Sequence, residues 1–171
     1  MVTKDLILGI MPNARNVDTI LPFLITGCDQ YEINTSKREN CFLAQVALEC
    51  GEFRYLKELA SGEEYEGRLD LGNTEPGDGI KFKGRGLIQI TGRANYQQIS
   101  DDFGVDFISN PELLETPQYA TQSACWFWNI HGLNPLADIE DFVRITKRIN
   151  GGTNRLIQRE MYWNKAKILN P

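Results

Sequence analysis

The sequence has 171 residues and a formal net charge of −5 at pH 7, with 42% hydrophobic and 24% charged residues. This composition excludes a disordered chain, a collagen and a disulfide scaffold, and the length predicts one domain over residues 1–171. The acidic balance argues against a nucleic-acid partner, and no apolar run reaches the roughly 18 residues of a membrane span, so stable membrane insertion is not expected.

The first half of the chain contains two predicted helices and one long irregular stretch. Apolar residues at helical spacing over 17–25 predict a first helix, and Pro22 must lie in its first turn or else kink it. Ser36 and Glu39 have the spacing of a capping box, and the apolar run that follows over 41–50 predicts a central helix enclosed by the rest of the protein. The irregular stretch, 61–85, is long for a loop inside a compact domain, and such loops are usually functional.

The only extended segment is predicted after this loop. Residues 87–90 form a short apolar run that we expect to be a short strand or an extended segment, and the pattern over 93–100 is helical. A further helix is expected to begin at Thr116, which can cap it, and to stop at Gly132.

Two more helices complete the chain. Asp138 is expected to cap the first, whose apolar face runs from Ile139 to Ile149, and the second spans about 154–169. The sequence therefore predicts an α+β fold that is mainly helical with a small β component, and a monomer is the default expectation.

The cysteine and histidine content bears on metal binding. There is one histidine and no CxxC pair among the four cysteines, so neither a metal site nor a cofactor is predicted. The cysteines have apolar neighbours and are interpreted as small buried hydrophobes. They are Cys28, Cys41, Cys50 and Cys125.

Glu49 is the first candidate for chemistry. It lies at the end of the apolar helix, and its helical neighbours Phe42 and Val46 are hydrophobic. A carboxyl group in such surroundings is costly to ionise, which favours the protonated form that a general acid needs. The alternative is an ordinary helix-end glutamate that pairs with Arg54 or Arg85.

Hydrolysis of a sugar acetal requires a second carboxylate to remove a proton from water. Glu58 is nine residues after Glu49 and would face the other way on one continuous helix, but Gly51 is a natural helix stop. We therefore expect Glu58 to fold back across a cleft from Glu49. A gap of about 6.5 to 9.5 Å between them would predict inversion of the anomeric centre. The acidic residues of the following loop are more simply explained as solvated side chains.

Short motifs occur in a fixed order along most of the chain. They are Phe42-Leu43-Ala44-Gln45, Glu49 with Gly51, Tyr65-Glu66-Gly67-Arg68, Gly72-Asn73-Thr74, Pro76-Gly77-Asp78-Gly79, Lys83-Gly84-Arg85-Gly86-Leu87-Ile88-Gln89-Ile90-Thr91-Gly92, Asn110-Pro111-Glu112-Leu113-Leu114, and Ile149-Asn150-Gly151-Gly152. With these motifs the chain resembles glycoside hydrolase family 19, the chitinase-like family, over roughly residues 38–165, and within it the short endolysins of bacteriophages.

The resemblance implies a lysozyme-like fold and inverting hydrolysis of a β-1,4 bond next to an N-acetylated amino sugar. It implies Glu49 as the general acid, Glu58 as the base and Thr91 as a hydroxyl that helps to hold the attacking water. Leu48 and Cys50 depart from the histidine and the serine or threonine that usually flank the acid, which leaves the acid in a more apolar setting.

Further positions are implied to bind sugar, and side-chain amides suit this role because each offers a donor and an acceptor. They are Gln89, Asn95, Asn150, Tyr96, Arg85 and Arg159. Three of these residues could instead have a purely structural role. Asn150 could simply end a helix before two glycines, and Arg85 could pair with Glu66 to organise the loop. The resemblance also implies that Arg159 lies near the acid and the base, where its charge could hold one carboxylate ionised, and the alternative is a surface charge on a helix.

Three functions follow from these residues and the resemblance. The first is an endolysin that cleaves bacterial peptidoglycan, held in the host cytoplasm until a separate holin-type pore lets it reach the cell wall. The second is a chitinase, which would carry a secretion signal that is not found at the start of this sequence. The third is an inactive module that binds cell-wall sugars and would tolerate loss of Glu49.

Overall fold

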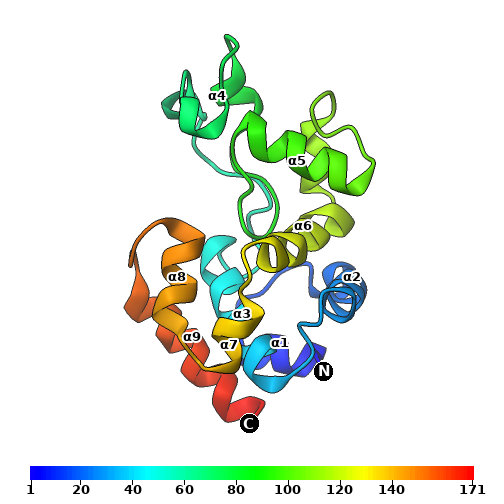
Figure 1. Ribbon diagram of the computed structural model, residues 1–171. Helices are drawn as coiled ribbons and strands as arrows, with labels where there is room; N and C mark the ends of the chain where they lie inside the picture. Colours follow the sequence, from blue (N-terminus) through cyan, green and yellow to red (C-terminus); the bar gives the residue numbers. More distant parts are fainter.

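The computed structural model describes residues 1–171, and α-helices account for most of it (Figure 1). The α-helices are α1 (Lys4–Ile10), α2 (Val17–Gln30), α3 (Ser36–Glu49), α4 (Asp78–Lys81), α5 (Arg93–Phe103), α6 (Pro117–Ile130), α7 (Asn134–Asp138), α8 (Phe142–Asn150) and α9 (Leu156–Leu169). Three short 3-10 helices are η1 (Glu63–Tyr65), η2 (Leu69–Leu71) and η3 (Pro111–Glu115). The mainly helical fold is confirmed.

The chain forms a helical body and a smaller, loop-rich lobe. Figure 1 shows α1, α2, α3 and α7 to α9 in the body, with α4, α5 and long connections above it. Helix α3 lies at the centre of the body and packs against α9, and its residues 39–47 are all buried. A helix that is apolar on every side has to be surrounded, so the predicted central helix is confirmed.

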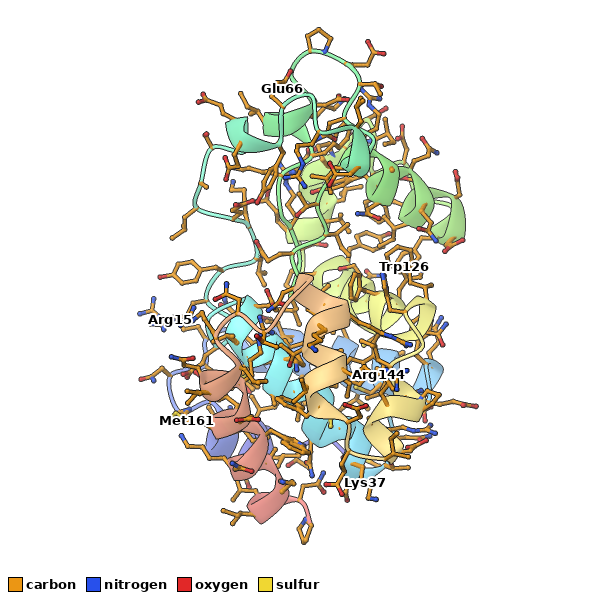
Figure 2. The ribbon with its side chains drawn as sticks, turned by 60° about the vertical axis from the view of Figure 1, so that its left-hand side comes forward. Arg15, Lys37, Glu66, Trp126, Arg144 and Met161 are labelled. Carbon is orange, nitrogen blue, oxygen red and sulfur yellow. The ribbon has the colours of Figure 1, made fainter.

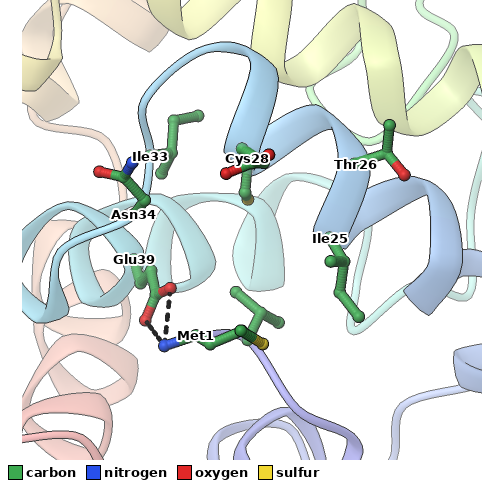
Figure 3. Close-up of a pocket in the computed structure, with 9 residues that line it drawn as sticks. Met1, Ile25, Thr26, Cys28, Ile33, Asn34 and Glu39 are labelled. Atoms are coloured by element: carbon green, nitrogen blue, oxygen red, sulfur yellow. Dashed lines mark hydrogen bonds and ion pairs between the residues drawn. The ribbon is translucent and has the colours of Figure 1, made fainter.

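The cap of α3 differs from the prediction. The Thr35 side chain accepts a hydrogen bond from the Arg38 amide, and Ser36 is already the first helical residue. Glu39 does not complete a capping box, because its buried carboxylate pairs with the Met1 ammonium at 3.1 Å (Figure 3). Buried carboxylates need such a partner, and this contact fastens the start of the chain to the central helix.

The expected strand over 87–90 is not present. The Arg85 and Ile90 backbones instead exchange hydrogen bonds of 3.1 and 2.8 Å across a tight loop, in which Gln89 has a φ of 60°. Isolated bridges from Arg85 to Ile90 and to Lys57 are the only β pairing. The prediction was wrong because a short apolar run can be buried in a loop as well as in a strand, and Leu87 contributes to the core in this way.

The helix expected to start at Asp138 starts later. Asp138 ends α7 and pairs with Arg38 at 2.7 Å, while Asp141 caps α8 through the Arg144 amide. Ile139, placed on the apolar face by the pattern, is 70% exposed because it lies in the turn between the two helices.

Two further features concern the environment of the chain. The four cysteines are free and buried, as expected for small hydrophobes. None of the helices combines the length and the apolar character that crossing a bilayer would require.

Candidate active site

Glu49 is the last residue of α3, and the chain turns directly after it at Gly51, which has a φ of 57°. The Glu49 side chain is 19% exposed, and its Oε1 lies 2.5 Å from Nη2 of Arg159, whose side chain is only 4% exposed. The carboxylate at the end of the apolar helix therefore faces a buried cation.

Arg159 is held by a buried chain of hydrogen bonds. Its Nη1 donates to Gln45 Oε1 at 2.6 Å, and Gln45 Nε2 donates to Thr146 Oγ1 at 2.8 Å. Gln45 and Thr146 are fully buried. Because a buried guanidinium is costly unless its N–H groups are satisfied, this chain fixes the direction from which Arg159 meets Glu49.

Glu58 is held on both of its carboxylate oxygens. Tyr65 donates its hydroxyl to Oε1 at 2.9 Å, and the Gly84 amide donates to Oε2 at 3.1 Å. Burial first, and the hydrogen bond to Glu58 second, raise the pKa of Tyr65 to about 12, so the phenol stays protonated at neutral pH. Donors on both oxygens fix the direction of the carboxylate, and a general base has to be positioned in this way.

The irregular loop places Tyr65. Asn73, which is fully buried, donates to the Tyr65 carbonyl at 2.8 Å and accepts from the Arg93 amide at 2.8 Å. Arg93 in turn donates to Asp78 at 2.7 Å. The loop is therefore ordered by its own buried polar network, and that network ends at the hydroxyl that contacts Glu58.

Three of the predicted site residues lie on one connected segment beside Glu58. Gln89 and Glu58 converge above Gly84, since a Cβ at Gly84 would lie 2.8 Å from Gln89 Oε1 and 3.1 Å from Glu58 Oε2. Thr91 donates its hydroxyl to the Gln89 carbonyl at 2.9 Å, which leaves the oxygen of Thr91 to accept a hydrogen bond from water. Asn95 donates to the Thr91 carbonyl at 2.7 Å, so its amide oxygen is still available.

Arg85 and Tyr96 are not in a position to bind substrate. The Arg85 side chain is 9% exposed, pairs with Glu115 at 2.8 Å and donates to the Tyr96 hydroxyl at 3.0 Å. Tyr96 is fully buried and donates to the Lys83 carbonyl. The proposed pairing of Arg85 with Glu66 was also wrong, because Glu66, at the far end of the upper lobe (Figure 2), accepts from two loop amides instead. Both Arg85 and Tyr96 fix the base of the lobe.

Asn150 and Arg159 have structural partners as well. Asn150 accepts from the Gly152 amide at 2.9 Å and donates to the Asn154 carbonyl at 3.2 Å, which are the contacts of a residue that ends a helix. The Asn154 carbonyl also accepts from Arg159 Nε at 3.2 Å. Arg159 therefore lies beside Glu49, and the Asn150 side chain makes contacts that end α8.

Cys50, one of the two departures beside the acid, is a structural residue. Its thiol bonds the Val46 carbonyl at 3.0 Å and accepts from the Phe53 amide at 3.3 Å. Burial raises the pKa of Cys50 to about 12, so it stays a thiol and closes the turn after α3.

The site is not an enclosed pocket. None of the four cavities of the structure is lined by Glu49 or Glu58, and no group of three histidine, cysteine, aspartate or glutamate side chains is arranged to hold a metal ion. Small-molecule sites are usually deep concavities. Glu49 and Glu58 therefore do not line a common concavity of that kind.

Sequence reasoning did not assign roles to Gln45, Thr146 and Tyr65. The signal for Gln45 was its place in an otherwise apolar helix, because a buried amide must have partners. No local signal pointed to Tyr65 or Thr146, since both reach their partners only through the tertiary fold.

Comparison with known proteins connects this geometry to a family. The family model described as chitinase class I matches residues 33–144. A glycosyl hydrolase family 19 domain-containing protein of Haemophilus influenzae is 37% identical over 102 residues, which are 60% of this chain and 49% of that protein. An endochitinase of Arabidopsis thaliana is 36% identical over 126 residues, which are 72% of this chain and 43% of that protein. The chain thus spans about half, or less, of the length of these relatives.

Solved structures show the same fold. Chitinase C from Streptomyces griseus superimposes with a TM-score of 0.82 at 21% identity, over 98% of this chain and 91% of that one. A class IV chitinase from Zea mays gives a TM-score of 0.63 at 22% identity, over 98% of this chain and 79% of that one. With the family model matched over more than half of its residues, the chain belongs to glycoside hydrolase family 19.

Proposed function

We propose that the chain is an inverting glycosidase that cleaves β-1,4 bonds next to N-acetylated amino sugars. The observation that carries the proposal is a pair of carboxylates with different contacts. Glu49 pairs with Arg159, whereas Glu58 accepts hydrogen bonds from Tyr65 and Gly84. Two carboxyl groups with different surroundings are what an acid and a base require.

Each side chain has a defined part in the proposed reaction. Glu49 donates a proton to the glycosidic oxygen as the bond to the anomeric carbon breaks. Glu58 takes a proton from a water molecule, which attacks that carbon from the opposite face and inverts it. Thr91 holds the water through its free oxygen lone pairs, and Arg159 stabilises Glu49 once it has lost its proton.

Bacterial peptidoglycan is the proposed substrate, because the order of motifs in the chain resembles that of bacteriophage endolysins. In that role the chain acts on the cell wall after a separate holin-type pore has released it from the host cytoplasm. Chitin is the second candidate, favoured by the relatives that are named endochitinases. Both polymers contain N-acetylglucosamine in β-1,4 linkage.

The test uses two isosteric variants and one control. Glu49→Gln and Glu58→Gln should each lose most hydrolysis while the thermal unfolding curve stays close to that of the native chain. Glu64→Gln, in an exposed residue of the loop without an ion pair, should retain full activity. Release of reducing ends is measured on purified peptidoglycan and on chitin, and mass spectrometry of the products identifies the bond that is cut. Full activity of Glu49→Gln or Glu58→Gln contradicts the role given to that residue, and an inactive native chain on both polymers supports the sugar-binding alternative.

A further inference from the structure

A hollow in the surface, separate from the candidate active site, lies where three helices meet. It has a volume of about 320 Å³ and is formed by the end of α2, the end of α5 and the first turns of α6. None of its lining residues belongs to the acid and base site. In Figure 1, α2 lies on the right of the molecule, whereas α8 and α9, which support Glu49, lie on the left. We call this hollow the α2/α5/α6 groove.

The groove is lined by polar side chains that are free to bind a ligand. Gln30 and Gln118 are exposed and Gln122 is half-buried, and the three amides line the hollow without a hydrogen bond to another side chain or to the backbone. The hydroxyls of Tyr31 and Tyr119 are also without a protein partner. These five groups come from two segments, 30–31 and 118–122, that the fold brings to one hollow, where they can bind an external ligand.

The aromatic side chains of the groove are held in place from behind. The Tyr119 ring packs edge-on against Phe107, with ring centroids 5.2 Å apart and an interplanar angle of 83°. Burial raises the pKa of Tyr31, so its hydroxyl stays a donor at neutral pH. Rings with a fixed orientation and a polar tip bind ligands at little cost in conformational entropy.

The charge of the groove narrows the class of ligand. Asp102 is its only ionisable carboxylate, and one oxygen of Asp102 already accepts from Trp126 Nε1 at 2.7 Å. No lysine or arginine lines the groove, which excludes an anion such as a phosphate. Primary amides, phenols and flat rings instead suit a neutral ligand with hydroxyl and acetamido groups.

We propose that the α2/α5/α6 groove is a second, non-catalytic binding site for β-1,4-linked N-acetylated amino sugars. The choice of sugar rests on the proposed function, because the site would hold the polymer that Glu49 and Glu58 cleave. A second contact on the same polymer raises the effective concentration of the chain at an insoluble substrate.

In the experiment, the β-1,4-linked N-acetylglucosamine tetramer is titrated into the Glu58→Gln variant, which should not hydrolyse it. The readout is the indole N–H signal of Trp126, which is labelled in Figure 2, in a two-dimensional NMR spectrum. This group donates a hydrogen bond to Asp102, which lines the groove. The signal should shift with saturation. In the added double variant Gln118→Ala, Gln122→Ala the affinity reported by this signal should fall about tenfold, as loss of two hydrogen bonds predicts. Gln98→Ala, in an exposed glutamine of α5 outside every cavity, is the matched control and should bind normally.

The outcomes separate this proposal from the catalytic one. A Trp126 signal that does not respond to the tetramer, or an unchanged affinity in the double variant, overturns the groove as a sugar site. Hydrolysis by the native chain is measured separately, so a chain that binds at the groove and cleaves nothing would contradict the catalytic function alone. In the native background the double variant should lose several-fold activity on insoluble polymer and keep its activity on the soluble tetramer.

Discussion

Removal of one hydroxyl at Tyr65 tests how the candidate base is held. In the structure this hydroxyl donates to Glu58 Oε1 at 2.9 Å, while Gly84 donates to the other oxygen. Hydrogen bonds to charged groups contribute about 1.5 to 3 kcal/mol, or roughly 10- to 150-fold in rate. Because Glu58 is partly exposed and the Gly84 amide remains, we expect the lower end, a decrease of about tenfold in kcat for Tyr65→Phe.

The division of the effect between kcat and KM distinguishes a positioning role from a purely structural one. Without the Tyr65 hydroxyl, the Glu58 carboxylate keeps a single donor, the Gly84 amide, and is no longer held in one direction. The decrease in Tyr65→Phe should therefore fall on kcat, with KM and the thermal unfolding curve nearly unchanged. Tyr55→Phe, in a tyrosine that is 42% exposed and whose hydroxyl forms no hydrogen bond, is the control. A Tyr65→Phe variant with native kcat, or one whose activity falls only because the fold is destabilised, refutes the reasoning.

Three other substitutions test the surroundings of the site. Gly84→Ala places a methyl group 3.1 Å from the carboxylate of the candidate base, and kcat should fall at least tenfold while the melting temperature changes little, as steady-state kinetics and calorimetry can check. Gln45→Leu removes the acceptor of Arg159 Nη1 and should cost about 1 to 3 kcal/mol in urea unfolding; an unchanged midpoint contradicts the buried network. The hydrogen bond from Arg93 lowers the pKa of Asp78 from 3.8, so this pair stabilises the fold above that pH and its contribution is lost as the pH falls through the lowered pKa. Asp78→Asn should therefore be about 2 kcal/mol less stable than the native chain between pH 5 and 7, and the difference should shrink below pH 3.8 in urea titrations.

Predictions that depended on local pattern were the most successful. Residues 41–48 are apolar except for Gln45, and this was enough to predict a central helix. A helix with apolar side chains on every face has to be buried on every face. Thr116 caps α6 as expected, since both the hydroxyl and the following proline act within one turn. The short helix α1 was not predicted, because seven residues carry too little periodicity to separate a helix from other structure.

Predictions that depended on distant partners were less successful. Arg85 has the same local sequence whether it binds sugar, Glu66 or Glu115, and only the fold brings Glu115 to it from 30 residues away. The sequence likewise left Asn150 open between binding sugar and ending a helix. Its contacts are fixed by the turn between α8 and α9, which the local sequence did not predict.

The sequence by itself determined the helical class, the enclosed helix that ends at Glu49 and the break at Gly51, because hydrophobic burial and helix termination act over a few neighbouring residues. Only the tertiary structure decided which groups hold the two carboxylates. Arg159 contacts Glu49, which is 110 positions away in the sequence, and Gln45 at a similar separation. Such contacts depend on how α3 and α9 pack against each other. Side-chain identity limits which partners are possible, and packing selects among them.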